Sequence, residues 1–144
     1  MKKRLLIAGC SHCLREYLFN GLYFLPKAYE LTKLYKKYDV YNLSKKNLTS
    51  KEALKLVSAF LDQLQFDGVF LSLGEGDIQF GVSVDEFKNN LETLVLLCKT
   101  RGISVVLNNN INKKENLEYY TVVEDIRIKN QSEYKYVSNR LVKA

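Results

Sequence analysis

Short apolar runs alternate along this chain with segments in which apolar residues recur every three or four positions. The runs, rich in apolar and β-branched residues, predict four strands at residues 5–8, 38–43, 68–73 and 103–107. The segments between them predict helices with one apolar face. A strand that is apolar throughout is buried on both faces, so the first and third runs predict central strands.

The helices that precede the third and fourth strands have wide apolar stripes and recognisable ends. Thr49 with Glu52, and Ser83 with Glu86, have the spacing of capping boxes, and Gly102 predicts a helix stop. The first stripe consists of Leu54, Val57, Leu61 and Leu64, widened by Leu56 and Phe60, and the second of Val84, Phe87, Leu91, Leu94, Val95 and Cys98. Residues 74–82, with three glycines and two acids, predict a loop.

The alternation of strands and helices predicts the fold class. Residues 13–23 and 27–37, separated by Pro26, have helical spacing and complete a strand–helix repeat. Such a repeat is typical of a three-layer α/β/α fold with a doubly wound, mostly parallel sheet of the flavodoxin type. No linker divides the chain, so we expect residues 1–144 to form a single domain.

The end of the chain, residues 111–144, leaves two alternatives open. Tyr119, Val122, Val123 and Ile126 fit the buried face of a helix. Residues 120–128 and 134–142, separated by a polar segment, fit a β-hairpin equally well. We expect a helix in one part of this segment.

Composition and charge narrow the classes of function. The chain is 47% hydrophobic and 26% charged, and its longest apolar runs are far shorter than the about 20 residues that a membrane span needs. The apolar run after Lys3 and Arg4 is too short for a signal peptide, and three cysteines suit reduced thiols, so we expect a cytoplasmic protein. The net charge of +6 is scattered and accompanies no nucleic-acid-binding signature, so nucleic acid is not an expected partner.

Polar residues follow each predicted strand, where open parallel sheets bind ligands. Ser11 comes after the turn at Gly9 and is the first candidate, either as a nucleophile or as the N-cap of the following helix. Glu75 and Asp77 are candidate general acids or bases, although Asp77 also suits a structural carboxylate that accepts bonds from backbone N–H groups. Residues 108–110, three asparagines, either line a pocket or end the fourth strand.

Cys10, His12 and Cys13 have the spacing of metal ligands or of a redox pair. A zinc site needs a second pair of ligands, however, and Cys98 belongs to a helix stripe, so we expect neither a metal nor a cofactor.

Three blocks of the chain resemble the SGNH (GDSL-type) hydrolases. Ile-Ala-Gly-Cys-Ser at residues 7–11 is similar to the family's Gly-Asp-Ser block with its nucleophilic serine. Residues 42–50 are similar to the loop that carries an oxyanion-hole glycine, and Gly-Glu-Gly-Asp at residues 74–77 to the Gly-x-Asn-Asp block. The resemblance covers about residues 4–108 and implies a serine ester or acyl hydrolase, with Ser11 as the nucleophile and Gly9, Cys10, Asn47 and Gly76 around the oxyanion site.

The chain departs from the family pattern at the residues that matter for catalysis. Cys10 replaces the aspartate, Asn47 the oxyanion glycine and Gly76 the oxyanion asparagine. The late Asp-x-x-His block is absent, and His12, the only histidine, directly follows Ser11. A serine without a base reacts poorly, and the loss of one oxyanion donor lowers the rate about 10²–10³-fold.

Three hypotheses follow for the function. The first is a weak or inactive SGNH-like esterase, in which Glu75 or Asp77 serves as the base. The second is a binding site for a small ester, acyl group or anion, and the third is a module that binds a partner protein. The sequence does not indicate the oligomeric state.

Overall fold

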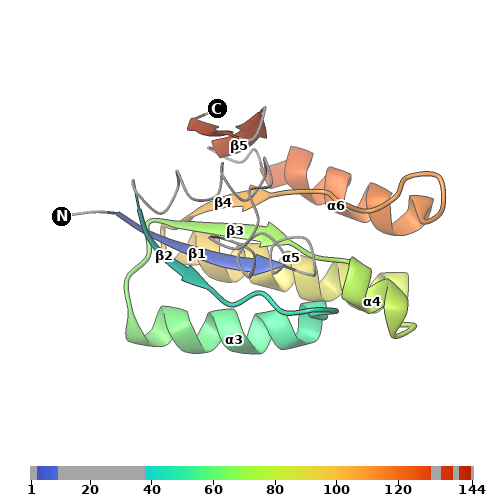
Figure 1. The fold of residues 1–144 in the computed structure, drawn as a ribbon, viewed down its shortest axis with the longest axis horizontal. Coiled ribbons are helices and arrows are strands. Elements are labelled where there is room, and N and C mark those ends of the chain that lie inside the picture. Colours follow the sequence, from blue (N-terminus) through green and yellow to red (C-terminus); the bar gives the residue numbers. More distant parts are fainter. Residues whose placement is uncertain (1–2, 10–37, 131–133, 138–139, 144) are drawn as a thin grey trace, which may run out of the picture.

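The computed structural model describes residues 3–9, 38–130, 134–137 and 140–143 of the chain. Its main sheet has four parallel strands: β1 Lys3–Gly9, β2 Tyr38–Asn42, β3 Gly68–Ser72 and β4 Ser104–Leu107. Their order is β2-β1-β3-β4 (Figure 1). The chain therefore moves to one side of β1 for β2 and to the other side for β3 and β4, which confirms the doubly wound, parallel α/β prediction.

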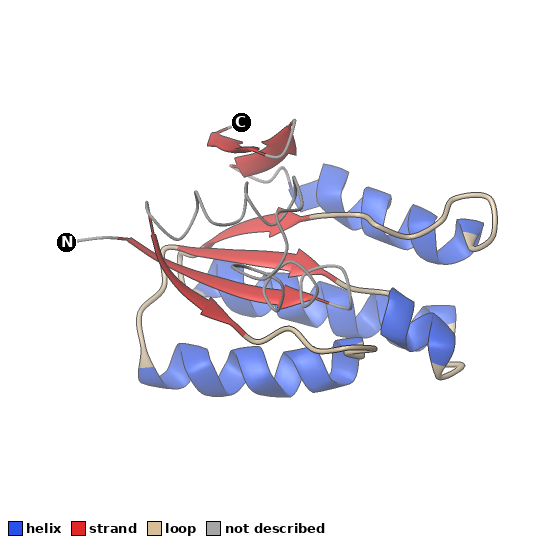
Figure 2. Cartoon of the chain, viewed as in Figure 1, coloured by secondary structure: helices blue, strands red, loops and turns tan. Residues whose placement is uncertain are grey.

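The helices that flank this sheet are α3 Ser50–Gln63, α4 Glu75–Gln79, α5 Val84–Thr100 and α6 Leu117–Asn130 (Figure 2). Helix α5 packs against both α3 and α6, and α6 runs beside β4. Val57, Leu91, Leu94 and Val123 are buried in the hydrophobic core that these helices share with the sheet. This burial explains why their apolar stripes have helical spacing.

Side chains alternate between the two faces of the sheet. Leu6, Ala8, Leu71 and Leu107 belong to the core under the helices α3, α5 and α6. Leu5, Ile7, Phe70 and Val106 face the other way, and these too are buried. Both faces of the sheet are therefore covered, as the continuous apolar runs predict.

The helix ends confirm the capping box predicted at Thr49, the serine cap at Ser83 and the helix stop at Gly102. Thr49 forms a complete capping box with Glu52 at the start of α3, and Ser83 Oγ accepts a hydrogen bond from the Glu86 backbone N–H at the start of α5. Gly102 has a φ of +71° directly after α5, and its N–H donates to the Lys99 carbonyl. Only glycine adopts that φ without steric cost, so Gly102 ends the helix.

Removal of the Thr49 side chain tests the capping box. We expect Thr49→Ala to lower the free energy of unfolding by about 1 kcal/mol, because the Glu52 N–H loses the Thr49 hydroxyl that accepts its hydrogen bond. Chemical denaturation measures the change. Thr121→Ala, at an exposed position inside α6, is the matched control, and an equal loss in both variants would contradict a specific role for the cap.

The structure corrects two predictions and resolves a third. Residues 75–79 form the short helix α4 where the glycines indicated a loop, and Leu56 is 38% exposed although it was assigned to a buried stripe. At the end of the chain α6 confirms the helix alternative. The hairpin expected between residues 120–128 and 134–142 is wrong in its pairing, because residues 120–128 belong to α6 and the observed hairpin joins β5 Tyr134–Val137 to β6 Arg140–Lys143. The helices expected at residues 13–23 and 27–37 lie outside the described residues.

No helix in the described part of the chain is long and apolar enough to cross a membrane.

Candidate functional site

The parallel register continues past the ends of the strands and brings four loops to one edge of the sheet. The Lys45 N–H donates to the Gly9 carbonyl at 3.3 Å, which places Ser44 beside Gly9. Gly9 pairs with Ser72, and the Asn108 N–H donates to the Leu71 carbonyl at 2.8 Å. Ser44, Gly9, Ser72 and Asn108 therefore lie at one level across the sheet, at the edge where such folds bind ligands.

Several predicted site residues lie outside the described part of the chain. Ser11, the candidate nucleophile, and Cys10 are among them, as are His12 and Cys13. Gly9 is described and ends β1 at the predicted edge. Among the described residues, no three His, Cys, Asp or Glu side chains are grouped as metal ligands.

Asp77 is fully buried and bonded to the start of α3. Its carboxylate accepts a bond of 2.7 Å from the Ser50 N–H and one of 2.6 Å from the Ser50 hydroxyl. Asn90 on α5 donates its amide N–H to the same hydroxyl oxygen at 3.0 Å. This chain of bonds joins α4, α3 and α5. Asp77 accepts a bond from a backbone N–H, as a structural carboxylate would, but the donor belongs to α3 and not to the glycine-rich segment around Asp77.

Glu75 differs from Asp77 in its surroundings. It lies in the first turn of α4 and is partly exposed, whereas Asp77 has no exposed surface. Burial raises the pKa of the Asp77 carboxyl above its ordinary value, although the bonds from Ser50 favour the charged form. The two candidate acids therefore do not share one environment.

Gly76 packs directly against the loop that follows β2. A β-carbon at this position would lie 2.5 Å from both the Asn47 and the Leu48 carbonyl oxygens. Asn47 itself has a φ of +58°, a conformation that glycine and asparagine tolerate best, so it occupies a backbone shape suited to the glycine it replaces. The loop and α4 thus leave no room for a side chain at residue 76.

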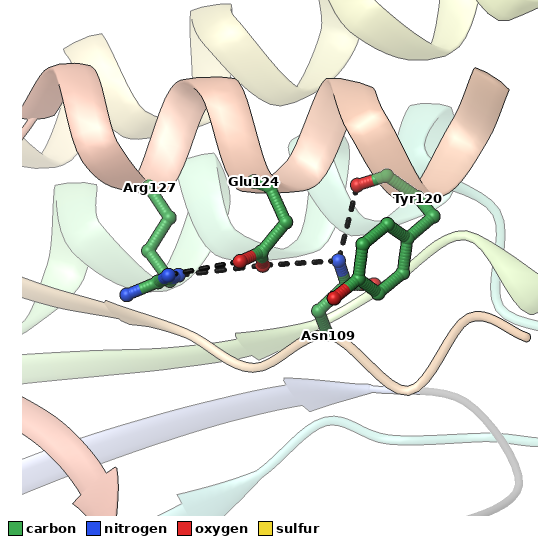
Figure 3. A network of polar contacts seen from close by, with 4 residues as sticks. All are labelled: Asn109, Tyr120, Glu124 and Arg127. Carbon is green, nitrogen blue, oxygen red and sulfur yellow. Dashed lines mark hydrogen bonds and ion pairs between the residues drawn. The ribbon is translucent and has the colours of Figure 1, made fainter. Parts of the chain in front are cut away.

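The three consecutive asparagines after β4 have different partners. Asn108 and Asn110 each donate an amide N–H to the hydroxyl oxygen of Ser72, at 3.3 and 3.1 Å. Asn109 instead points to α6, where its amide bonds to the Tyr120 carbonyl and the Glu124 carboxylate, both at 3.1 Å (Figure 3). The hydrogen bond from Arg127 holds the pKa of Glu124 below its ordinary value. Asn109 therefore anchors α6, while Asn108 and Asn110 line the sheet edge.

Two polar groups at the end of β2 are buried without a hydrogen-bond partner. They are the amide nitrogen of Asn42 and the hydroxyl of Ser44, and they are the only such side-chain atoms in the described part of the chain. The Asn42 amide oxygen is occupied, because it accepts the Ser44 N–H at 3.0 Å. Buried polar atoms rarely lack a partner, so this pair marks the edge as unusual.

Sequence reasoning identified residues 108–110 at this edge but missed Ser72, Ser50 and Asn90. Ser72 had a detectable signal, since a polar residue within an otherwise apolar strand run is unexpected. Ser50 and Asn90 carried none, because small polar residues are common near helix starts and on helix surfaces.

A separate groove of about 700 Å³ lies at the opposite edge of the sheet, near the amino ends of β1, β3 and β4. Both arginines that line this groove, Arg4 and Arg101, already have hydrogen-bond partners within the protein. Arg4 donates to the Gln65 carbonyl, and Arg101 donates to the Leu61 carbonyl and pairs with Asp62. These bonds secure the end of α3, so the groove offers no free cationic group from the two arginines.

Comparisons with solved structures identify the fold. No protein-family model and no curated protein sequence matches the chain. The psychrotrophic esterase EstA from Pseudoalteromonas sp. is 21% identical, with 91% of this chain and 75% of that chain covered and a TM-score of 0.66. The acetylxylan esterase Axe2 from Geobacillus stearothermophilus is 20% identical, with 92% and 75% covered and a TM-score of 0.69.

AlinE4, an SGNH-hydrolase family esterase, is 18% identical, with 92% of this chain and 74% of that chain covered and a TM-score of 0.67. At these identities the likeness establishes the fold alone. The chain has the mostly parallel sheet with flanking helices of SGNH-hydrolase esterases, which confirms the fold that the sequence resemblance implied.

Proposed function

We propose that this chain is an SGNH-hydrolase-like protein with a degenerate catalytic site, weak or inactive as an ester hydrolase. The fold of the solved esterases EstA and Axe2 supports the hydrolase-like part of the proposal. The chain's only histidine directly follows Ser11, and neighbouring side chains on a strand-to-helix turn do not normally aim at one another. A serine hydroxyl needs a base within hydrogen-bond reach before it attacks an ester.

The packing of Gly76 carries the proposal. The resemblance assigns this position to an asparagine whose amide would stabilise the developing oxyanion, and glycine supplies no such donor. The β-carbon of any other residue would lie 2.5 Å from two backbone carbonyl oxygens of the loop at residues 47 and 48. This close packing supports a site that lacks the asparagine donor and has no room for one. The missing donor alone corresponds to a loss of about 10²–10³ in rate.

The candidate bases support the same interpretation. Asp77 is fully buried, and each of its two oxygens accepts a bond from Ser50. A carboxylate whose two oxygens are both bonded in this way is poorly suited to act as a general base. Glu75 is partly exposed and remains the candidate base of a weak, rewired hydrolase.

A non-catalytic site for a small acyl group or anion is the alternative function. The observation that favours it is the pair of buried, unpartnered polar groups on Asn42 and Ser44 at the carboxyl edge of the sheet. Groups of this kind are costly unless something compensates for them, and a bound ligand would do so.

A serine-directed fluorophosphonate probe and p-nitrophenyl acetate test the proposal. We expect the wild type to show no labelling at Ser11 and to hydrolyse the ester no faster than Ser11→Ala, while the esterase EstA, assayed in parallel, gives a strong signal. Glu75→Gln is the companion variant. A weak Ser11-dependent rate that falls in Glu75→Gln would assign the rewired hydrolase, whereas strong labelling and rapid turnover that vanish in Ser11→Ala would overturn the proposal.

A further inference from the structure

The groove at the amino edge of the sheet has the size of a small-molecule site. Its volume of about 700 Å³ lies within the range of about 300–1,000 Å³ that such sites occupy. The end of α3, the segment that leads into β3, the start of β1 and the residues that follow α5 form its walls. The groove lies at the opposite end of the strands from Gly9 and Ser72, so it is separate from the candidate catalytic site.

Hydrogen bonds hold the four charged side chains of this groove in place. Arg101 donates to a backbone carbonyl of α3 at 2.9 Å and to the Asp62 carboxylate at 2.6 Å, and so it links the ends of α5 and α3. Arg4 donates from its guanidinium group to the Gln65 carbonyl at 3.3 Å and from its backbone N–H to the Asp67 carboxylate at 2.8 Å. Side chains that are already held lose little freedom when a ligand binds.

The charges of these side chains are balanced. Two arginines and two aspartates line the groove, and Asp62 pairs directly with Arg101. An anion in the groove would lie near two carboxylates, and a cation would lie near two guanidinium groups, so neither sign of charge is favoured. The lining therefore suits an uncharged ligand.

The lining offers both donors and acceptors of hydrogen bonds. A guanidinium group has more N–H donors than the bonds of Arg4 and Arg101 use, and the two carboxylates have further acceptor capacity. Gln63 and Gln65 add amide side chains, which both donate and accept. A hydroxyl group also donates and accepts at one atom, so a ligand rich in hydroxyl groups can bond to such a lining throughout.

Little apolar surface is open to a ligand in this groove. Leu61, Phe66 and Ile103 line it, but only 5%, 7% and 7% of their surface is exposed. A long acyl chain or the apolar anchor of a peptide would need a larger apolar wall. The C–H groups of a sugar ring need only a small one.

We propose that this groove binds an uncharged saccharide, with Arg4, Gln65 and Asp67 bonding its hydroxyl groups. Gln65 and Asp67 are exposed, and both line the groove. Arg101 and Asp62 pair with each other and act as positioning residues for the wall at the end of α3. The inference goes beyond the proposed function, because it involves neither Ser11 nor the carboxyl edge of the sheet.

Titration with the methyl glycosides of glucose, galactose, mannose and xylose, followed by amide chemical shifts in NMR spectra, tests the site. Gln65→Ala removes a side-chain amide and keeps the carbonyl that accepts the Arg4 bond, and Asp67→Asn keeps an oxygen for the Arg4 N–H but removes the charge. Gln79→Ala and Asp125→Asn, at exposed positions on α4 and α6 that do not line the groove, are the matched controls. Glucuronate and glucosamine are the charged probes, and N-acetylglycinamide is the peptide probe.

We expect saturable binding of at least one methyl glycoside by the wild type and by both controls. The affinity should fall about three- to tenfold in Gln65→Ala and in Asp67→Asn, the equivalent of one hydrogen bond. Glucuronate and glucosamine should bind no more tightly than the best methyl glycoside, because the charges of the groove are balanced.

The proposal fails if no methyl glycoside saturates the wild type, or if Gln65→Ala and Asp67→Asn bind as tightly as their controls. Tighter binding of either charged probe would overturn the assignment of an uncharged ligand. Saturation by N-acetylglycinamide without binding of the glycosides would indicate a peptide instead. Gln65→Ala leaves the bonds of Arg4 and Arg101 in place, so it decides the outcome even where Asp67→Asn does not fold.

Discussion

Gly76→Ala should lower the free energy of unfolding by about 3 kcal/mol or more, at the upper end of overpacking effects. The new methyl group would lie 2.5 Å from the Asn47 and Leu48 carbonyl oxygens, and both obstacles are backbone atoms that cannot rotate away. Helix propensity alone predicts the opposite sign, because alanine favours a helix over glycine by about 1 kcal/mol. Chemical denaturation of the variant and the wild type shows whether the substitution lowers or raises the free energy of unfolding.

Gly81→Ala is the control for this measurement. Gly81 has a φ of +68° and nothing within 4 Å of its missing β-carbon, so it tests backbone strain without a clash. We expect a loss of about 1–2 kcal/mol there, smaller than at Gly76. A Gly76→Ala variant as stable as the wild type would mean that the loop after β2 moves aside easily, and it would remove the main support for the proposed degenerate catalytic site.

Asp77→Ala should lower the free energy of unfolding by about 3 kcal/mol. Its carboxylate is the partner of both the Ser50 N–H and the Ser50 hydroxyl, and each buried donor left unpaired costs about 1–3 kcal/mol. Asp77→Asn keeps the shape and one acceptor oxygen, so it should cost less. Asp125→Ala, at an exposed position on α6, is the control and should change the unfolding free energy by less than about 0.5 kcal/mol.

The contribution of Asp77 to the free energy of unfolding should depend on pH, because the pKa of its carboxyl is raised in the folded protein. A carboxyl whose pKa is higher in the folded state than in the unfolded state binds more protons when folded, so acid favours folding at this group. The wild type should therefore gain stability relative to Asp77→Asn as the pH falls through the folded-state pKa toward the ordinary value of 3.8. Denaturation of both proteins at neutral and mildly acidic pH measures this difference, and a constant difference would contradict the shift.

Local physical signals in the sequence were sufficient for most of the fold. Continuous apolar runs predicted the parallel strands, because a strand covered on both faces must be apolar throughout. Thr49 and Gly102 predicted helix ends through their own side chain or backbone preference. The short helix α4 was missed, because its glycine-rich sequence favours a turn and its stability depends on distant contacts, such as those of Asp77 with Ser50.

The sequence by itself determined the α/β class with a doubly wound, mostly parallel sheet and the departures from the SGNH pattern at residues 10, 47 and 76. These follow from periodicity and residue identity, which act over a few neighbouring positions. Only the tertiary structure decided that Gly76 is pressed against the loop after β2 and that Ser44, Gly9, Ser72 and Asn108 lie at one level across the sheet. Those relations join segments dozens of residues apart, and the register of the strands sets them.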